Sequence, residues 1–286
     1  RFTVLTKLPL YKENEKNGYR VQLQRDHVTH SDFFLNLTYE DPAWRKVVRD
    51  KRFRQALNMA IDREEILDAV YYGYGEMPTI VPAEYDPKKA EQLLDEMGMK
   101  KGADGFRTDP DGQPFMIPFE YSTQDPTFGP AVEIVTANWK QIGINTSAKM
   151  IDSQLWGQRN TANQLQAAVL WSEIPLWYWG GLAMGLWAPL WWRWWNSEGQ
   201  DGEEPPEEVK AFYQKMNEIV VVPAAQGPSV FEEAKKMVYE NVWFMPPLEN
   251  IRQAMIVNAK FGNVPQDPSV MSIAFNFSME QVYFED

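Results

Sequence analysis

The 286-residue sequence has no cysteine, only two histidines, and fewer basic than acidic side chains, 28 against 40. The lack of cysteine excludes a disulfide scaffold, a thiolate metal site and a cysteine nucleophile. The net charge of −12 disfavours duplex DNA or RNA as a partner, because phosphates are bound by Lys and Arg. We therefore expect no nucleic-acid ligand.

Motifs of catalysis and cofactor binding are missing as well. The sequence contains no Gly-rich phosphate loop, no Gly-x-Ser-x-Gly elbow and no His-Glu-x-x-His. His27 and His30 lack the helical spacing of a metal pair and are predicted to lie on the surface. Asp109-Pro110-Asp111-Gly112 begins like a calcium loop, but Pro114 and Phe115 follow, so we expect a turn. We expect no metal, no cofactor and no catalytic residue. A hydrolase that uses two catalytic carboxylates stays open as an alternative, because the sequence has 40 acidic residues.

The sequence is rich in aromatic residues, with 12 Trp, 12 Tyr and 15 Phe, and 44% of its residues are hydrophobic. This composition is enough to build a core, which excludes a wholly disordered chain. Eight of the tryptophans fall within residues 171–195. Indole rings stack on sugars, aromatic side chains and peptide planes, so this cluster predicts a ligand-binding surface. Core filling, or burial against a lobe outside this chain, is the alternative.

The candidate ligand contacts in this cluster are four tryptophans and one acid: Trp171, Trp177, Trp179, Trp187 and Glu173. Glu173 is the only charged residue between Ala162 and Trp192, and its carboxylate can accept from an ammonium or from sugar hydroxyls. A solvated loop position is the alternative for Glu173. Residues 174–192 carry no charge, but their Pro, Gly and Trp content disfavours a transmembrane helix.

Helix and strand patterns alternate along the middle of the chain and predict an α/β sheet. Asp62 and Asp86 are predicted to cap helices, and Gly98 to end the second of them. The predicted strands are 18–25, 32–39, 105–108, 113–121, 144–150, 166–171 and 252–257. The predicted helices are 51–61, 62–70, 86–98, 125–142, 152–164, 206–221 and 228–242.

Four segments in order carry a resemblance to a known family. They are Asp50–Ile66, Tyr85–Leu94, Gly105–Gln113 and Trp139–Ile144. Together they resemble the family-5 extracellular solute-binding proteins, the oligopeptide and dipeptide receptors of ABC importers. The resemblance covers roughly residues 18–264. One departure is at Trp171-Ser172-Glu173, where the family often has an Asp-rich loop that holds a peptide amino terminus, and here only Glu173 can supply that carboxylate.

The resemblance implies a fold of periplasmic-binding-protein type II, in which two α/β lobes close on a ligand. Because the family's receptors are longer, this chain looks like a C-terminal half, consistent with its start at Arg1 rather than Met. Residues 38–246 would form an α/β lobe with a mixed sheet. Residues 1–37 and 247–286 would belong to the other lobe, with hinge strands near Asn36–Tyr39 and Pro246–Val257.

The implied function is that of a non-catalytic, extracytoplasmic receptor, which is monomeric and partnered by ABC importer permease subunits. The full-length protein would be periplasmic or held at the cell surface by a lipid anchor. The ligand is an oligopeptide by family frequency, or an oligosaccharide by the tryptophan content. Two other classes stay open: a carbohydrate-active enzyme with a Trp platform, and an interaction module that docks through its tryptophans.

Overall fold

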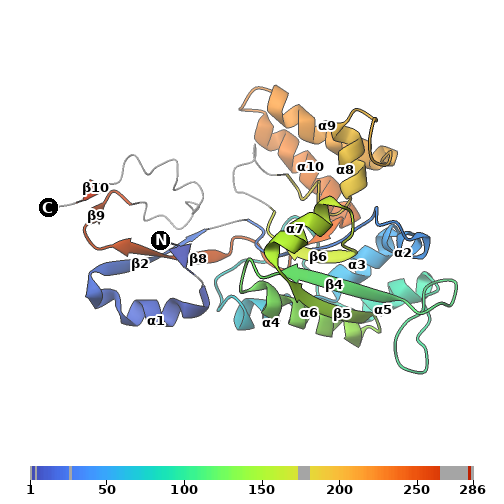
Figure 1. The fold of residues 1–286 in the computed structure, drawn as a ribbon, viewed down its shortest axis with the longest axis horizontal. Coiled ribbons are helices and arrows are strands. Elements are labelled where there is room, and N and C mark those ends of the chain that lie inside the picture. Colours follow the sequence, from blue (N-terminus) through green and yellow to red (C-terminus); the bar gives the residue numbers. More distant parts are fainter. Residues whose placement is uncertain (1, 4, 26–27, 173–180, 265–282, 285–286) are drawn as a thin grey trace.

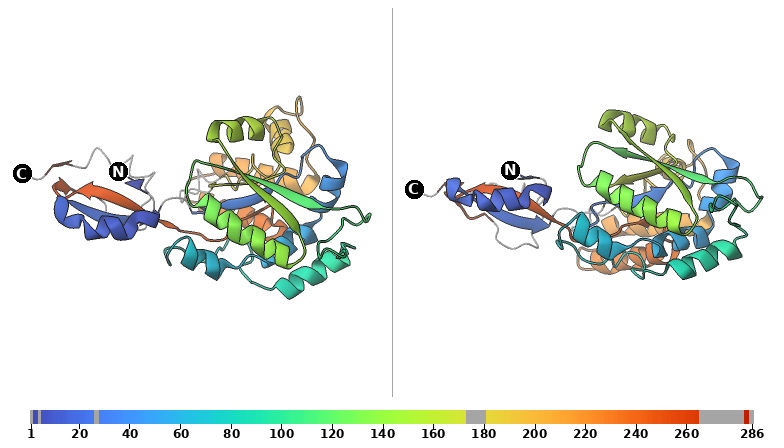
Figure 2. Two further views of the ribbon diagram at one scale, coloured as in Figure 1. Left: turned by 60° about the horizontal axis from the view of Figure 1, so that its bottom comes forward. Right: turned by 90° about the horizontal axis from the view of Figure 1, so that it is seen from below.

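The computed structural model describes residues 2–3, 5–25, 28–172, 181–264 and 283–284 (Figure 1). The described chain forms an α/β body and a smaller part built on a narrow sheet beside it, which lies at the left in Figures 1 and 2. The first and last strands of the described chain, residues 2–3 and 283–284, both belong to the smaller part. A mixed α/β lobe, as the sequence predicts, is confirmed.

The strands of the α/β body are β3 (Asp32–Leu35), β4 (Met116–Ser122), β5 (Asn145–Ile151), β6 (Ala167–Leu170) and β7 (Phe244–Met245). They form one sheet in the order β5-β4-β6-β3-β7. Strand β4 runs parallel to β5 and β6, whereas β3 runs antiparallel to β6 and β7. The sheet is therefore mixed, with β6 at the junction between its parallel and antiparallel parts.

The helices of the body are α2 (Pro42–Val48), α3 (Lys51–Met59), α4 (Arg63–Ala69), α5 (Pro87–Glu96), α6 (Phe128–Gln141), α7 (Ser153–Thr161), α8 (Pro189–Asn196), α9 (Glu207–Val221) and α10 (Gly227–Asn241). In Figure 1, helix α6 lies below the sheet and α7 above it. Helices α9 and α10 pack side by side next to α8 (Figure 1).

The core joins the sheet to the helix that carries the family resemblance. Phe33 and Phe119 pack at 5.4 Å between ring centroids, and Phe119 meets Trp139 of α6 at 6.2 Å. The Trp139 indole donates to the Leu57 carbonyl of α3 at 3.0 Å. Arg54 of α3 is buried and donates to the Val48 and Val242 carbonyls at 2.7 and 3.1 Å. Both contacts fix α3 within the lobe, because a buried donor must find an acceptor.

Local signals placed several helix ends correctly. The Asp62 carboxylate accepts from the Glu65 amide at the start of α4, and the Asp86 carboxylate accepts from the Lys89 amide at the start of α5. Gly98 follows α5 with φ +82°, a conformation that residues with a Cβ rarely adopt. The Asp109 turn is also confirmed, because its carboxylate accepts from the amides of Asp111 and Gln113.

Other sequence predictions differ from the structure. Residues 105–108 form only isolated bridges, Lys101 to Arg107 and Thr108 to Pro114, rather than a strand. Helix α8 lies in the Trp-rich region, where no helix is predicted. None of the helices within the described ranges is long and apolar enough to cross a bilayer.

The smaller part contains β1 (Phe2–Thr3), η1 (Leu5–Lys7), α1 (Leu8–Glu13), η2 (Glu15–Asn17), β2 (Tyr19–Arg25), β8 (Arg252–Asn258), β9 (Phe261–Gly262) and β10 (Tyr283–Phe284). Strand β8 pairs antiparallel with β1 and β2 in the order β1-β8-β2, and β9 pairs with β10. The β2–β8 register runs from Tyr19 opposite Asn258 to Arg25 opposite Arg252.

The chain passes between the two parts twice. We call residues 28–31, before β3, the first crossing, and residues 246–251, between β7 and β8, the second crossing. The first crossing lies earlier than the predicted Asn36–Tyr39, and the expected boundary at residues 37/38 moves with it. The reason is that Phe33 and Phe34 are buried and pair with β6 and β7, so β3 belongs to the lobe sheet.

Candidate functional site

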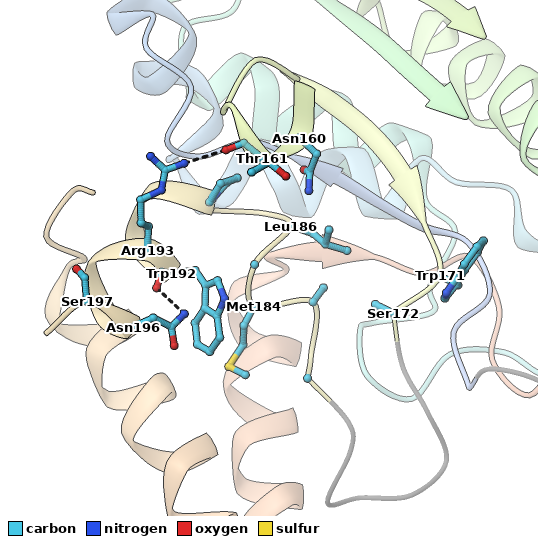
Figure 3. Close-up of a pocket in the computed structure, with 14 residues that line it drawn as sticks. Asn160, Thr161, Trp171, Ser172, Met184, Leu186, Trp192, Arg193, Asn196 and Ser197 are labelled. Carbon is cyan, nitrogen blue, oxygen red and sulfur yellow. Dashed lines mark hydrogen bonds between the residues drawn. The ribbon is translucent and has the colours of Figure 1, made fainter. Parts of the chain in front are cut away.

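A cavity of about 790 Å³ opens between α7, α8 and residues 181–186 (Figure 3). Its apolar wall includes Trp171, Met184, Leu186 and Trp192. The polar side chains Asn160, Thr161, Ser172, Asn196 and Ser197 line it as well. This volume falls within the range of small-molecule sites, which combine apolar walls with a few polar groups.

Trp192 is held in the cavity wall by two packing contacts. Its ring meets Tyr213 of α9 edge-on at 5.5 Å between centroids. It also lies against Gly185, where an added Cβ would come within 3.0 Å of the Trp192 Cδ1 atom. Only a residue without a side chain fits there unless the indole moves. The half-buried Trp192 ring is therefore positioned by its surroundings.

The charge of the wall comes from Arg193, the one charged side chain among the described residues that line the cavity. Its Nη2 donates to the Thr161 carbonyl at 2.8 Å and so joins α8 to the end of α7, as Figure 3 shows. Its Nε lies 3.7 Å from an Asp201 carboxylate oxygen. The described wall is otherwise neutral, with amide and hydroxyl groups that can both donate and accept.

The structure places only some of the sequence-predicted ligand contacts at the cavity. Trp171 lies at the cavity edge, half-buried, and stacks on Phe128 with centroids 5.9 Å apart and planes at 29°. Trp187 is fully buried, parallel to Trp243 at 4.8 Å, and its indole donates to the Leu182 carbonyl at 3.2 Å. The Trp187 ring therefore has no exposed face for a ligand in this structure. Glu173, Trp177 and Trp179 lie outside the described residues.

Sequence reasoning did not single out Trp192, Met184 or Asn160 as cavity residues. Trp192 belongs to the predicted cluster, but the sequence does not distinguish it from its neighbour Trp191. Trp191 is buried, and the Trp191 indole donates to the Glu203 carboxylate at 3.1 Å. The signal that separates the two residues is their position around helix α8, counted from its first residue Pro189. This position can be worked out only once the region is known to be helical.

A buried polar cluster lies where the first crossing enters the sheet, next to the cavity edge. We call Thr29, Asp32 and Ser172 the hinge cluster. The hydroxyls of Thr29 and Ser172 both donate to Asp32 Oδ2, the first at 3.0 Å. Asp32 is 0% exposed, and burial raises its pKa to about 7, although the bonds from Ser172 and Thr29 act in the opposite direction.

His30 lies next to the hinge cluster and corrects a prediction. It is 2% exposed rather than a surface residue, and its Nε2 lies 3.1 Å from Asp125 Oδ2; His27 lies outside the described residues. Burial alone would raise the Asp125 pKa, but the contacts with His30 and Thr127 outweigh it and lower that pKa to about 2. The His30 ring packs edge-on against Tyr71, at 6.0 Å between centroids.

The second crossing is tied to the body and to the first crossing. The buried Glu249 carboxylate accepts from the Thr79 and Ile80 amides at 2.7 and 2.9 Å. The backbone N–H of Asn250 donates to the Val28 carbonyl at 2.7 Å, and this bond joins the two crossings directly. Within the described ranges, no group of three or more His, Asp or Glu residues is arranged to hold a metal ion.

Comparison with known proteins gives the family and the fold. Residues 4–201 match the profile of the bacterial extracellular solute-binding proteins, family 5 Middle. Heme-binding protein A of Haemophilus influenzae is 33% identical over 135 residues, 42% of this chain and 23% of that protein. The oligopeptide-binding protein AppA of Bacillus subtilis is 32% identical over 149 residues, 45% of this chain and 27% of that protein.

Solved structures extend the likeness to nearly the whole chain. The oligopeptide-binding protein OppA superposes with a TM-score of 0.72 at 26% identity, covering 98% of this chain and 51% of that one. The binding protein MelB of Agrobacterium fabrum, in complex with stachyose, has a TM-score of 0.74 at 17% identity, covering 94% and 45%. This chain thus spans about half the length of the structures it matches.

Proposed function

Because this chain belongs to the family 5 bacterial extracellular solute-binding proteins, we propose that it is the ligand-capturing component of an ABC importer, which takes up oligopeptides between two lobes. The observation that carries the proposal is the cavity itself. Two half-buried tryptophans line it, and Trp171 lies beside the crossing that leads out of the lobe.

The proposed mechanism is capture by closure. A ligand enters the cavity, displaces water from the Trp171 and Trp192 faces, and stabilises the closed state by binding it more tightly than the open one. Each well-placed ring contributes about 1 kcal/mol beyond its buried area. No chemical step is assigned to this chain, and the relatives that it matches are named as binding proteins.

The oligopeptide ligand is supported by the relatives and by the polar wall. Amide side chains such as Asn160 and Asn196 can pair with both the N–H and the C=O groups of a peptide backbone. Glu173 remains the candidate partner for a peptide amino terminus, and Trp177 and Trp179 remain candidate ring contacts. Trp187 is proposed instead to support the wall from behind.

An oligosaccharide is the second candidate, and one observation favours it. The described wall carries no carboxylate, while flat indole faces and neutral amide and hydroxyl groups suit a sugar.

The proposed receptor role has further parts, whichever ligand is bound. They are a periplasmic or cell-surface location, permease subunits as partners, a lipid anchor and a monomeric state.

Mass spectrometry of small molecules that co-purify with the protein expressed from its complete gene tests the ligand class. Calorimetry with the compound found then tests the site. We expect Trp192→Ala to weaken binding about tenfold, which corresponds to about 1.4 kcal/mol. The matched control is Trp194→Ala, which removes a neighbouring indole that does not line the cavity. Equal effects of both variants would contradict the site, and release of reducing sugar from an oligosaccharide panel would favour an enzyme.

A further inference from the structure

The hinge cluster connects two segments that the ligand site needs. Thr29 and Asp32 belong to the chain that comes from the smaller part, whereas Ser172 directly follows Trp171 at the cavity edge. Beyond the two hydroxyl donors on Asp32 Oδ2, the Ser172 amide donates to the Thr29 carbonyl at 3.4 Å. Trp171 itself leans on Phe128, the first residue of α6.

Several ionisable groups surround Asp32, and they oppose one another. His30 of the first crossing favours the ionised form of Asp32, and Glu249 of the second crossing disfavours it. Asp125, before α6, faces His30, and Tyr71, after α4, contacts the Ser31 hydroxyl at 3.1 Å. Burial is the largest effect and raises the Asp32 pKa to about 7, so both protonation states are populated near neutral pH.

The two states hold Ser172 differently. An ionised carboxylate only accepts, and hydroxyl bonds to it are roughly twice as strong as bonds to a neutral group. A protonated Asp32 can carry its proton on Oδ1, which accepts no hydrogen bond within the described residues, so Oδ2 keeps both hydroxyl donors but loses its charge. Protonation therefore weakens the link between Asp32 and Ser172.

We propose that Asp32 is a positioning residue of the ligand cavity: when ionised it holds Ser172 firmly and thereby fixes Trp171 in the cavity wall, and when protonated it holds both less tightly. The result is a cavity edge that is ordered above neutral pH and loosened below it. This inference rests on the proposed function for the cavity's role, but the position of Trp171 can be measured with no ligand present.

The test is fluorine NMR of the chain labelled with 5-fluorotryptophan, recorded over a pH series without ligand. Trp171→Phe and Trp192→Phe assign the two cavity resonances. We expect the Trp171 resonance to move with a midpoint near pH 7 and to broaden on the acid side. The Trp192 resonance lies in the same cavity but away from the hinge cluster, and it should stay in place.

Two variants separate the cluster from its surroundings. Asp32→Asn removes the titrating group and keeps an oxygen that can accept, so the Trp171 resonance should no longer move near pH 7. Ser172→Ala, at a half-buried position, leaves Asp32 to titrate but removes its link to Trp171, and it should flatten the response too. A Trp171 resonance that is flat in the wild type, or that moves unchanged in both variants, overturns the proposal. If the Trp171 resonance moves as expected but no ligand is found, the role of Asp32 is supported and only the proposed function is contradicted.

Discussion

The Ser172 hydroxyl donates to the Asp32 carboxylate across 140 residues of sequence. This contact joins the strand that enters the lobe to the strand that ends at the cavity. Because Asp32 is fully buried, a change in its charge affects the free energy of unfolding as well as the cavity.

Replacing Asp32 by Asn should stabilise the protein at alkaline pH. The folded-state pKa of Asp32 is raised from 3.8 to about 7, so the stability tied to its proton is present below about pH 4 and is lost as pH rises through 7. The wild type therefore carries a cost of on the order of 2–4 kcal/mol above that range. Urea unfolding at about pH 5 and about pH 8 should show Asp32→Asn more favourable at the higher pH. An equal difference at the two values would refute the expected titration.

Asp125 should show the opposite pH dependence. Its pKa is lowered to about 2, so the stability from its bonds with His30 and Thr127 is present above about pH 4 and is lost as pH falls towards 2. Asp125→Asn should cost about 1–3 kcal/mol at neutral pH, because His30 loses its charged partner. Thr127→Val removes one hydroxyl donor and serves as the milder comparison. Denaturant midpoints that are unchanged at neutral pH in Asp125→Asn would contradict this expectation.

Trp187 should matter for stability rather than directly for ligand contact. Its ring is fully buried between Trp243 and neighbouring aromatic residues, so Trp187→Ala should cost about 3–5 kcal/mol. Trp194→Ala, which removes a partly exposed ring, should cost far less. Thermal unfolding of the two variants checks the difference, and similar losses in both would count against a core role for Trp187.

Gly185→Ala should disturb the cavity with little change in overall stability. The added methyl would lie 3.0 Å from the Trp192 Cδ1 atom, so the indole must shift. Gly181→Ala is a matched control in the same wall, because no atom of the described residues lies within 4 Å of the position that its added methyl would take. The Trp192 fluorine resonance should move in Gly185→Ala and not in Gly181→Ala. Movement in both would mean that the contact is not specific.

The 286-residue chain on its own should bind its ligand weakly or not measurably. It spans about half of the receptors it resembles, and a clamp without its opposite wall buries only one side of a ligand. Calorimetric titration with the compound that co-purifies with the complete gene product checks this. Tight binding by the chain alone would show that one wall is sufficient.

Local signals in the sequence were enough for much of the fold. Asp62 and Asp86 cap helices because a short acidic side chain reaches amides within its own turn, which is information contained in neighbouring residues. The apolar stripe within residues 51–61 predicted α3, and the strand patterns of residues 18–25 and 252–257 predicted β2 and β8.

The sequence could not separate residues whose roles depend on tertiary contacts. Trp187 and Trp192 are chemically alike, and only their packing against Trp243 and Gly185 places one in the core and the other at the cavity. His30 looked like a surface residue because its partner Asp125 lies 95 positions away. The first crossing was placed too late because the burial of β3 between β6 and β7 is a property of the assembled sheet.

The pairing of β2 with β8 has a mechanical consequence. Seven residue pairs lie in continuous antiparallel register, and the Asn250 amide joins the Val28 carbonyl just before that pairing begins. Two separate linkers would let the smaller part swivel or slide in several directions. Two linkers that are bonded to each other cannot move independently, so bending at one crossing is coupled to bending at the other.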